Sequence, residues 1–142
     1  EGLAEPALVL TPSAGPSADD GFLTASEIAD LELPADFVAL SACNTANLEF
    51  TRIAQDLPAL SSAFARAGAH ATLGTLWPVN SQTGATVGAD VFARLAVAGA
   101  AGPAEALAQA QRAYIAAPPS RARLHPRFWA PFIILGDGAR PR

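Results

Sequence analysis

The sequence feature that most constrains the fold is a pair of short apolar runs on either side of a helical stretch. The first run, FVALSAC at residues 37–43, is too short for a buried helix, begins with β-forming residues and lacks strict alternation. Strands buried on both faces of a parallel sheet have this pattern, and ATLGTLW at residues 71–77 is a second such run. Between them, LPALSSAFARAG spaces its apolar residues at helical intervals and ends in Gly68, a favourable helix C-cap. This order predicts a right-handed β-α-β unit with two parallel strands.

Further elements extend this unit at both ends. They are a strand at 7–10, a surface loop at 11–21, a helix at about 25–31 with a capping box of Thr24 and Glu27, helices at about 83–98 and 102–117, and a strand at 132–135. One helix between two strands keeps them parallel, whereas two successive antiparallel helices reverse the direction of the chain. The last strand should therefore run antiparallel to 71–77. The sequence predicts an α/β fold with a mostly parallel sheet and an antiparallel edge strand.

The composition limits the class of protein. The 142 residues suffice for one domain with a core, and no apolar run approaches the ~20 residues of a membrane-spanning helix. One cysteine and no signal-peptide pattern favour a reducing, cytoplasmic location, and Ala, Arg and Pro in place of Lys and Met suggest a GC-rich bacterial source. The net charge is −4 and no basic cluster resembles a surface that follows a phosphate backbone. Neither nucleic acid nor a membrane is therefore expected as a partner.

The one cysteine, Cys43, stands at the carboxyl end of the first strand of the unit. Open parallel sheets bind ligands at the carboxyl ends of their strands, and the WPVNS loop after the second strand should project from the same edge. A cysteine at such a position can be a nucleophile when a nearby histidine lowers the thiol pKa and amide groups hold the oxyanion. The alternative is a small apolar side chain that fills the junction between strand and helix.

Neither histidine of the chain suits the role of base. His70 immediately precedes the strand at 71–77, so the length of that strand, at ~3.3 Å per residue, separates it from Cys43 by more than about 15 Å. His125 precedes the last strand, so it can lie at the same end of the sheet as Cys43. It would still be two strands away from Cys43, at a distance of ~10 Å. A base has to approach its proton to about 3 Å. The residues therefore contain a plausible nucleophile without a base.

Other signatures of enzymes are absent from the sequence. There is no G-x-S-x-G elbow, G-x-G-x-x-G turn, Walker loop or His/Cys cluster with metal-ligand spacing, so no metal or cofactor is expected. Asp19 and Asp20 lie in a loop rich in Gly, Ser and Pro and are expected to be solvated. Trp77 either lines a pocket or covers the core, and the sequence alone favours neither.

Five segments, spread over nearly the whole chain, resemble a known family. They are LTASEIADLEL, VALSACNTA, GAHATLGTLWPVNSQTGA, GPAEALAQAQRAYI and HPRFWAPFIILGDG. LSACNT and LWPVN are specific in this order and spacing, whereas either alone would be weak. Together the segments resemble the CHAT domain, a caspase-like cysteine peptidase domain that is related to separase and commonly attached to TPR repeats in bacteria.

The resemblance implies a fold, a catalytic pair and a place in a longer protein. The fold would be the caspase–hemoglobinase-like three-layer α/β sandwich. Cys43 would be the nucleophile, and the base would be a histidine in an H-x-x-x-H-G-like segment shortly upstream of ALVLTP. Residues 1–142 are therefore expected to be the C-terminal portion of one CHAT domain without its histidine-bearing N-terminal portion, and to be inactive alone. The sheet would then be incomplete on its N-terminal side, with an open edge through which the chain could dimerise.

The resemblance also implies a site for the substrate residue before the scissile bond, the P1 residue. Trp77, Pro78, Asn80 and Ser81 would wall this site. Relatives usually carry an acidic residue soon after the W-x-V of this loop, which helps to bind a basic P1 side chain. This chain has no carboxylate at residues 80–83, so a basic P1 side chain would lack an opposing charge. The expected substrate is a peptide or protein, cleaved through a thioester on Cys43.

Two other functions stay open at this point. A non-catalytic CHAT-like module would bind partners as part of a TPR scaffold protein. A generic cytosolic α/β domain would use Cys43 only to fill its core.

Overall fold

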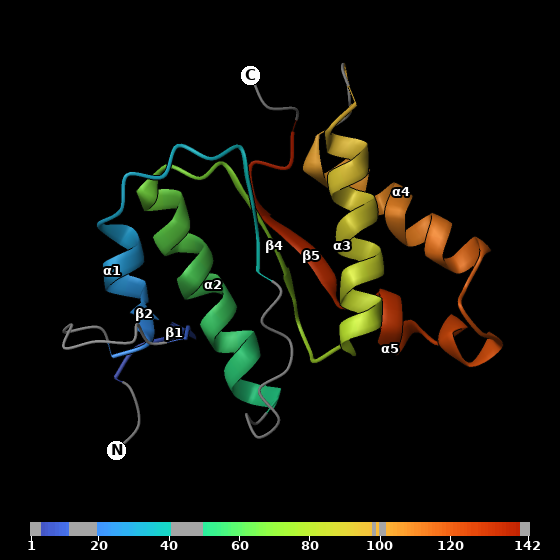
Figure 1. Ribbon diagram of the computed structural model, residues 1–142, viewed down its shortest axis with the longest axis horizontal. Coiled ribbons are helices and arrows are strands. Elements are labelled where there is room, and N and C mark those ends of the chain that lie inside the picture. The colour runs from blue at the N-terminus through green and yellow to red at the C-terminus, as the bar shows by residue number, and fades with distance from the viewer. Residues whose placement is uncertain (1–3, 12–19, 41–49, 98, 100–101, 140–142) are drawn as a thin grey trace.

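A computed structural model shows a sheet with helices on both sides (Figure 1). It describes residues 4–11, 20–40, 50–97, 99 and 102–139. Helices α1 (Ala25–Ala29) and α2 (Phe50–Ala67) lie on one side of the main sheet, and α3 (Ser81–Leu95) and α4 (Pro103–Ala116) lie on the other. The remaining elements are β1 (Ala7–Val9), β2 (Phe22–Thr24), β3 (Phe37–Ala39), β4 (Ala71–Thr75), the 3-10 helix η1 (Arg121–Leu124), α5 (Pro126–Trp129) and β5 (Phe132–Gly136).

The main sheet has the strand order β3-β4-β5. β3 pairs in parallel with β4, and β5 pairs antiparallel with the other edge of β4. The predicted parallel pair and the predicted antiparallel edge strand are both confirmed. The described sheet holds one pairing of each kind, so it is evenly mixed and not mostly parallel as expected.

The sheet separates two apolar cores. Phe37 and Ala39 of β3 pack into the core beneath α3 and α4, whereas Val38 and Leu40 pack into the core beneath α1 and α2. This alternation follows from the two-residue period of side chains along a strand. All five residues of β4 are buried, as the sequence predicts for a strand covered on both faces.

The N-terminal segment forms a small hairpin and a capped helix. β1 and β2 pair antiparallel, and the sequence predicted only the first of these strands. The capping box at the start of α1 is confirmed, because Thr24 Oγ1 accepts a hydrogen bond from the Glu27 amide at 3.3 Å and Glu27 Oε2 accepts one from the Thr24 amide at 2.8 Å. Ile28 of this helix is fully buried against α2. The capping box therefore fixes where α1 starts, and Ile28 fixes which face it buries.

Apart from the start of α2, the long helices begin and end within three residues of the predicted positions. α3 starts after Asn80, whose Oδ1 accepts a hydrogen bond from the Thr83 amide at 2.8 Å, and α4 starts with Pro103. α2 ends at Ala67 and is followed by Gly68, where φ is +113°, but it starts at Phe50 and continues through Pro58. A proline inside a helix removes one hydrogen bond, which is why the sequence pattern indicated only the part from residue 57 onwards.

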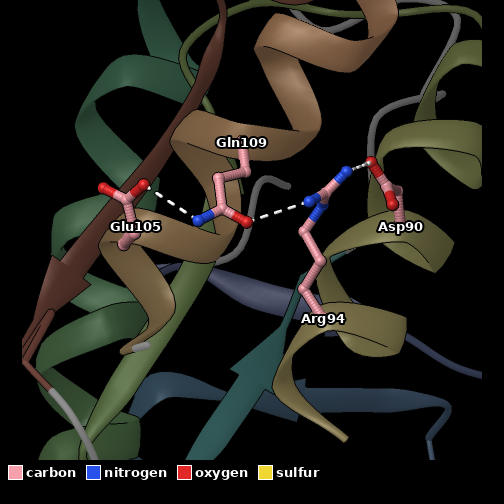
Figure 2. Close-up of polar contacts among 4 residues, drawn as sticks. All are labelled: Asp90, Arg94, Glu105 and Gln109. Atoms are coloured by element: carbon pink, nitrogen blue, oxygen red, sulfur yellow. Dashed lines mark hydrogen bonds and ion pairs between the residues drawn. The ribbon is translucent and has the colours of Figure 1, made fainter. Parts of the chain in front are cut away.

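A seam of polar side chains joins α3 to α4 (Figure 2). Arg94 donates hydrogen bonds to Asp90 Oδ2 at 3.0 Å and to Gln109 Oε1 at 2.9 Å. Gln109 in turn donates to Glu105 Oε1 at 3.0 Å. The seam therefore fixes the register of the two helices that cover one face of the sheet.

The same seam affects the ionisation of Glu105. The hydrogen bond from Gln109, with smaller contributions from Arg112, lowers the pKa of the Glu105 carboxyl, while its slight desolvation acts in the opposite direction. A lowered folded-state pKa means that the stabilisation from this group is present above its unfolded pKa and is lost as the pH falls through its folded pKa. Since Glu105 is exposed, water and salt screen this effect.

Candidate functional site

The carboxyl edge of the main sheet is where three separate segments of the chain meet. β3 ends next to β4, and the Leu40 amide donates a hydrogen bond to the Leu73 carbonyl at 2.9 Å. β5 enters from the other side, and the Leu76 amide donates to the Pro131 carbonyl at 3.0 Å. The exits of β3 and β4 and the entrance to β5 therefore share one edge, as the topology predicted.

A small, mostly apolar pocket lies at this edge. Its walls come from the ends of β3 and β4, the first turn of α3 and the start of β5, through Ala39, Leu40, Leu73, Gly74, Thr75, Gly84 and Phe132. Glycine occupies two of these positions, in different surroundings. A Cβ atom on Gly74 would lie 2.4 Å from Leu57 Cδ1, whereas one on Gly84 would have only Val79 Cγ2 nearby, at 3.8 Å. The pocket is suited to a small apolar or neutral group.

The predicted nucleophile, Cys43, lies outside the described residues. The last described residue before it is Leu40, which lines the pocket. Leu40 stands three positions before Cys43 in the sequence. The role of Cys43 stays a prediction.

The four residues predicted to wall a P1 site lie on the loop after β4 and at the start of α3. The indole of Trp77 donates a hydrogen bond to the Arg127 carbonyl at 3.0 Å, which joins this loop to α5. Asn80 caps α3, and the side chains of Pro78 and Ser81 are exposed. None of the four is among the residues that line the described pocket, so their part in substrate binding stays a prediction.

The structure separates the two histidines as the strand directions predicted. His70 is exposed at the amino edge of β4, with Nδ1 4.0 Å from Asp36 Oδ1. His125 lies on the carboxyl side of the sheet, where its Nδ1 accepts a hydrogen bond from the Arg127 amide at 3.2 Å and caps α5. Within the described ranges, no three His, Cys, Asp or Glu side chains gather closely enough to hold a metal ion.

A polar cluster at the first turn of α3 was not foreseen from the sequence. Thr83, which is fully buried, has its hydroxyl 3.3 Å from the buried hydroxyl of Tyr114. Arg123 reaches the same Thr83 hydroxyl at 3.3 Å. The cluster joins α3, α4 and η1 over sequence separations of 31 and 40 residues, and no local pattern encodes such contacts.

The Thr83–Tyr114 pair should stabilise the fold as a unit. Thr83→Val leaves the buried Tyr114 hydroxyl without this partner, so we expect a loss of about 1–3 kcal/mol in the free energy of unfolding. Adding Tyr114→Phe removes the stranded hydroxyl, and the double variant should recover part of the loss. Urea unfolding of the two single variants and the double variant measures this coupling. Strictly additive losses would show that the two hydroxyls do not interact.

Comparisons with known proteins agree with the resemblance seen in the sequence. Residues 1–137 match the family described as the CHAT domain. The chain is 30% identical over 125 residues to human tetratricopeptide repeat protein 28, covering 88% of the chain but 5% of the relative. It is 32% identical over 118 residues to the mouse protein of the same name, covering 83% of the chain and 4% of the relative. No solved structure matches the chain.

Two expectations are not decided by these comparisons. Both relatives are mammalian, so the bacterial source inferred from composition stays a prediction, as does the cytoplasmic location. Across the described part of the chain, no helix has the length and apolar character needed to cross a membrane.

Proposed function

The chain belongs to the CHAT domain family, and we therefore propose that it supplies the nucleophile of a caspase-like cysteine endopeptidase. The observation that carries this proposal is the pocket at the carboxyl edge of the sheet, whose wall includes Leu40, three residues before Cys43. A substrate side chain in this pocket would bring its carbonyl group close to the segment that contains the cysteine.

The proposed reaction is acyl transfer through a thioester. The Cys43 sulfur attacks the carbonyl carbon, the carbon–nitrogen bond breaks, and a histidine gives its proton to the leaving amine. Water then attacks the thioester and regenerates the thiol. Backbone amides near the nucleophile would hold the oxyanion. Because His70 lies at the opposite edge and His125 caps α5, we propose that the histidine comes from outside residues 1–142 and that this chain alone is inactive.

The same proposal includes the wider protein. We propose that the main sheet is part of a caspase–hemoglobinase-like sandwich and that β3, whose outer edge has no partner among the described strands, pairs there with a further strand or a second copy of the chain. Both relatives are named as tetratricopeptide repeat proteins, and the chain spans only about one twentieth of their length. An attached TPR domain would select or present the protein substrate.

A non-catalytic scaffold is the second candidate, because the names of both relatives refer to repeats and not to hydrolysis. In this case the CHAT domain would bind partners without cleaving them. The two candidates are separated by incubating the full-length protein with a library of fluorogenic peptides. Turnover that iodoacetamide abolishes supports the peptidase, whereas a folded protein without turnover supports the scaffold.

The pocket can be tested with a pair of glycine variants in α3. Gly84 lines the pocket, whereas a methyl group added at Gly88, one turn further on, would have no heavy atom within 4 Å. Both changes to alanine should raise the free energy of unfolding by up to about 1 kcal/mol, because glycine is a poor helix former. Only Gly84→Ala should lower kcat/KM, by about tenfold, because its methyl group narrows the pocket.

Steady-state kinetics and urea unfolding of both variants check this prediction. Equal kinetic effects of the two substitutions would mean that the pocket does not receive the substrate.

A further inference from the structure

We propose, on the basis of the proposed peptidase function, that the carboxyl edge of the sheet recognises an acidic peptide segment through Arg123 and Arg127. The side chains of these two arginines lie beside one aromatic ring, next to the turn of α3 that lines the pocket. The inference goes beyond the reaction itself, because it names the chemistry of the substrate.

The first observation is a local excess of positive charge. The chain as a whole has a net charge of −4, but residues 57–89 and 106–136 contain no aspartate or glutamate. These two segments supply β4, the loop after it, the start of α3, η1, α5 and the start of β5. The short run RARLHPR at residues 121–127 adds three arginines and a histidine to this edge. The described segments that form the edge are therefore positive, although the protein is acidic.

The second observation is how Arg123 is held. Its guanidinium donates to Gln82 Oε1 at 2.9 Å, and more weakly to Thr83 Oγ1 at 3.3 Å and Asn80 Oδ1 at 3.4 Å. All three acceptors are neutral, so they orient the guanidinium, and no carboxylate of the described residues forms an ion pair with it. A guanidinium has five N–H donors in a planar fork that suits a carboxylate.

The third observation is the pairing of two positive charges around Phe128. The guanidinium carbon of Arg123 lies 5.8 Å from the centre of this ring, and that of Arg127 lies 5.3 Å from it. Ion pairs between described residues involve other basic groups, and neither of these arginines takes part in one. Both positive charges therefore lie near the same ring, and an anionic group bound beside that ring would be attracted to both.

The arginines lie close enough to the pocket to act on the same substrate. Arg123 donates a hydrogen bond to Gln82 in the first turn of α3, and Gly84 of that turn lines the pocket. α5 carries Arg127 and is joined to the loop after β4 by the hydrogen bond from Trp77. A peptide with one side chain in the pocket would thus place its neighbouring residues near both guanidinium groups. A basic residue there would be repelled, whereas aspartate or glutamate would be attracted.

A peptide fits these observations better than a nucleic acid does. The positive charge is confined to two short elements, η1 and α5, in a protein of net charge −4. Binding to a phosphate backbone depends on many contacts between basic side chains and phosphates along the strand. A single guanidinium can bind a peptide carboxylate.

The test measures binding with the full-length protein that carries Cys43→Ala, so that its outcome does not depend on catalysis. The probes are fluorescein-labelled peptides with alternating glutamate and alanine, the matching glutamine–alanine peptide, and a single-stranded DNA oligonucleotide of about the same length. We expect the acidic peptide to bind at least about tenfold more tightly than the neutral one, with an affinity that falls as salt rises. Arg123→Gln and Arg127→Gln should each weaken binding by about fivefold to tenfold.

The matched control is Arg66→Gln, which removes the same charge from an exposed site at the far end of α2. It should change the affinity by less than twofold. Arg127→Gln serves as the variant that should stay folded, because the Arg127 side chain makes no hydrogen bond or ion pair among the described residues. Loss of its contact with Phe128 should lower the melting temperature by at most about 4 °C.

Three results would overturn the proposal. The first is equal affinity for the acidic and neutral peptides. The second is a loss of affinity with Arg66→Gln as large as with Arg123→Gln or Arg127→Gln. The third is a DNA probe that binds more tightly than the acidic peptide and depends equally on both arginines. The peptidase proposal fails separately: acidic peptides that bind in an arginine-dependent way but are never cleaved by the unsubstituted protein would contradict only the peptidase.

Discussion

Replacing Cys43 by alanine should abolish peptide hydrolysis by the full-length protein. We expect kcat/KM to fall by at least about 1,000-fold, because removing the nucleophile removes the covalent pathway and leaves only the weak catalysis that binding provides. The affinity for the acidic peptide should change by less than twofold, since the pocket and the two arginines are untouched. Initial rates with a fluorogenic acidic peptide and a binding titration measure the two quantities.

Two comparisons make this experiment decisive. Iodoacetamide should inactivate the unsubstituted protein and label Cys43, which is the only cysteine in residues 1–142, and bound acidic peptide should slow the labelling. A Cys43→Ala variant that keeps more than a tenth of the activity would show that Cys43 is not the nucleophile. A protein that binds its peptide but never turns it over, with or without Cys43, would instead be a scaffold.

The largest expected effect on stability comes from Gly136, at the end of β5. Its φ of +96° lies in a region that side chains rarely adopt. A Cβ atom at this position would lie 2.6 Å from the His70 carbonyl oxygen and 3.3 Å from Ala71 Cα. Both neighbours are backbone atoms, and the His70 carbonyl also accepts the Asp137 amide at 2.8 Å. Gly136→Ala should therefore lower the free energy of unfolding by more than about 2 kcal/mol. It should also move the carboxyl end of β5 away from the amino end of β4, with which it pairs.

Gly88→Ala is the matched control for this change. It adds the same methyl group to a helix, in open space, so its effect should have the opposite sign. Urea unfolding of the two variants measures the difference. If Gly136→Ala were as stable as the unsubstituted protein, the contact between His70 and Gly136 would not be present in solution.

Several parts of the fold could be predicted from the sequence because they depend on local patterns. The two buried strands and the helix between them follow from periodicity, and the antiparallel direction of β5 follows from the number of helices that precede it. The cap at Thr24 and the proline in the first turn of α4 follow from residue type alone. β2 and α5 were missed, because they have three and four residues and their formation depends on tertiary contacts.

The candidate site was predictable in place but not in detail. Strand directions locate the segments after β3 and β4 at one edge, and they separate His70 from it. The contacts of Arg123 and Tyr114 join residues that are 31 to 43 positions apart, and nothing in the sequence specifies those pairs. The sequence analysis did not single out the run RARLHPR, and only the fold shows that it lies beside the first turn of α3.

The first turn of α3 has two different neighbours. Gly84 faces the pocket, while Gln82, Thr83 and the capping residue Asn80 hold Arg123. Under the proposed function, residues 80–84 would set both the size of the accepted side chain and the charge preferred beside it. Substrate preference could then diverge between paralogues through changes in a few consecutive codons, without any change in the nucleophile or in the strands that support it.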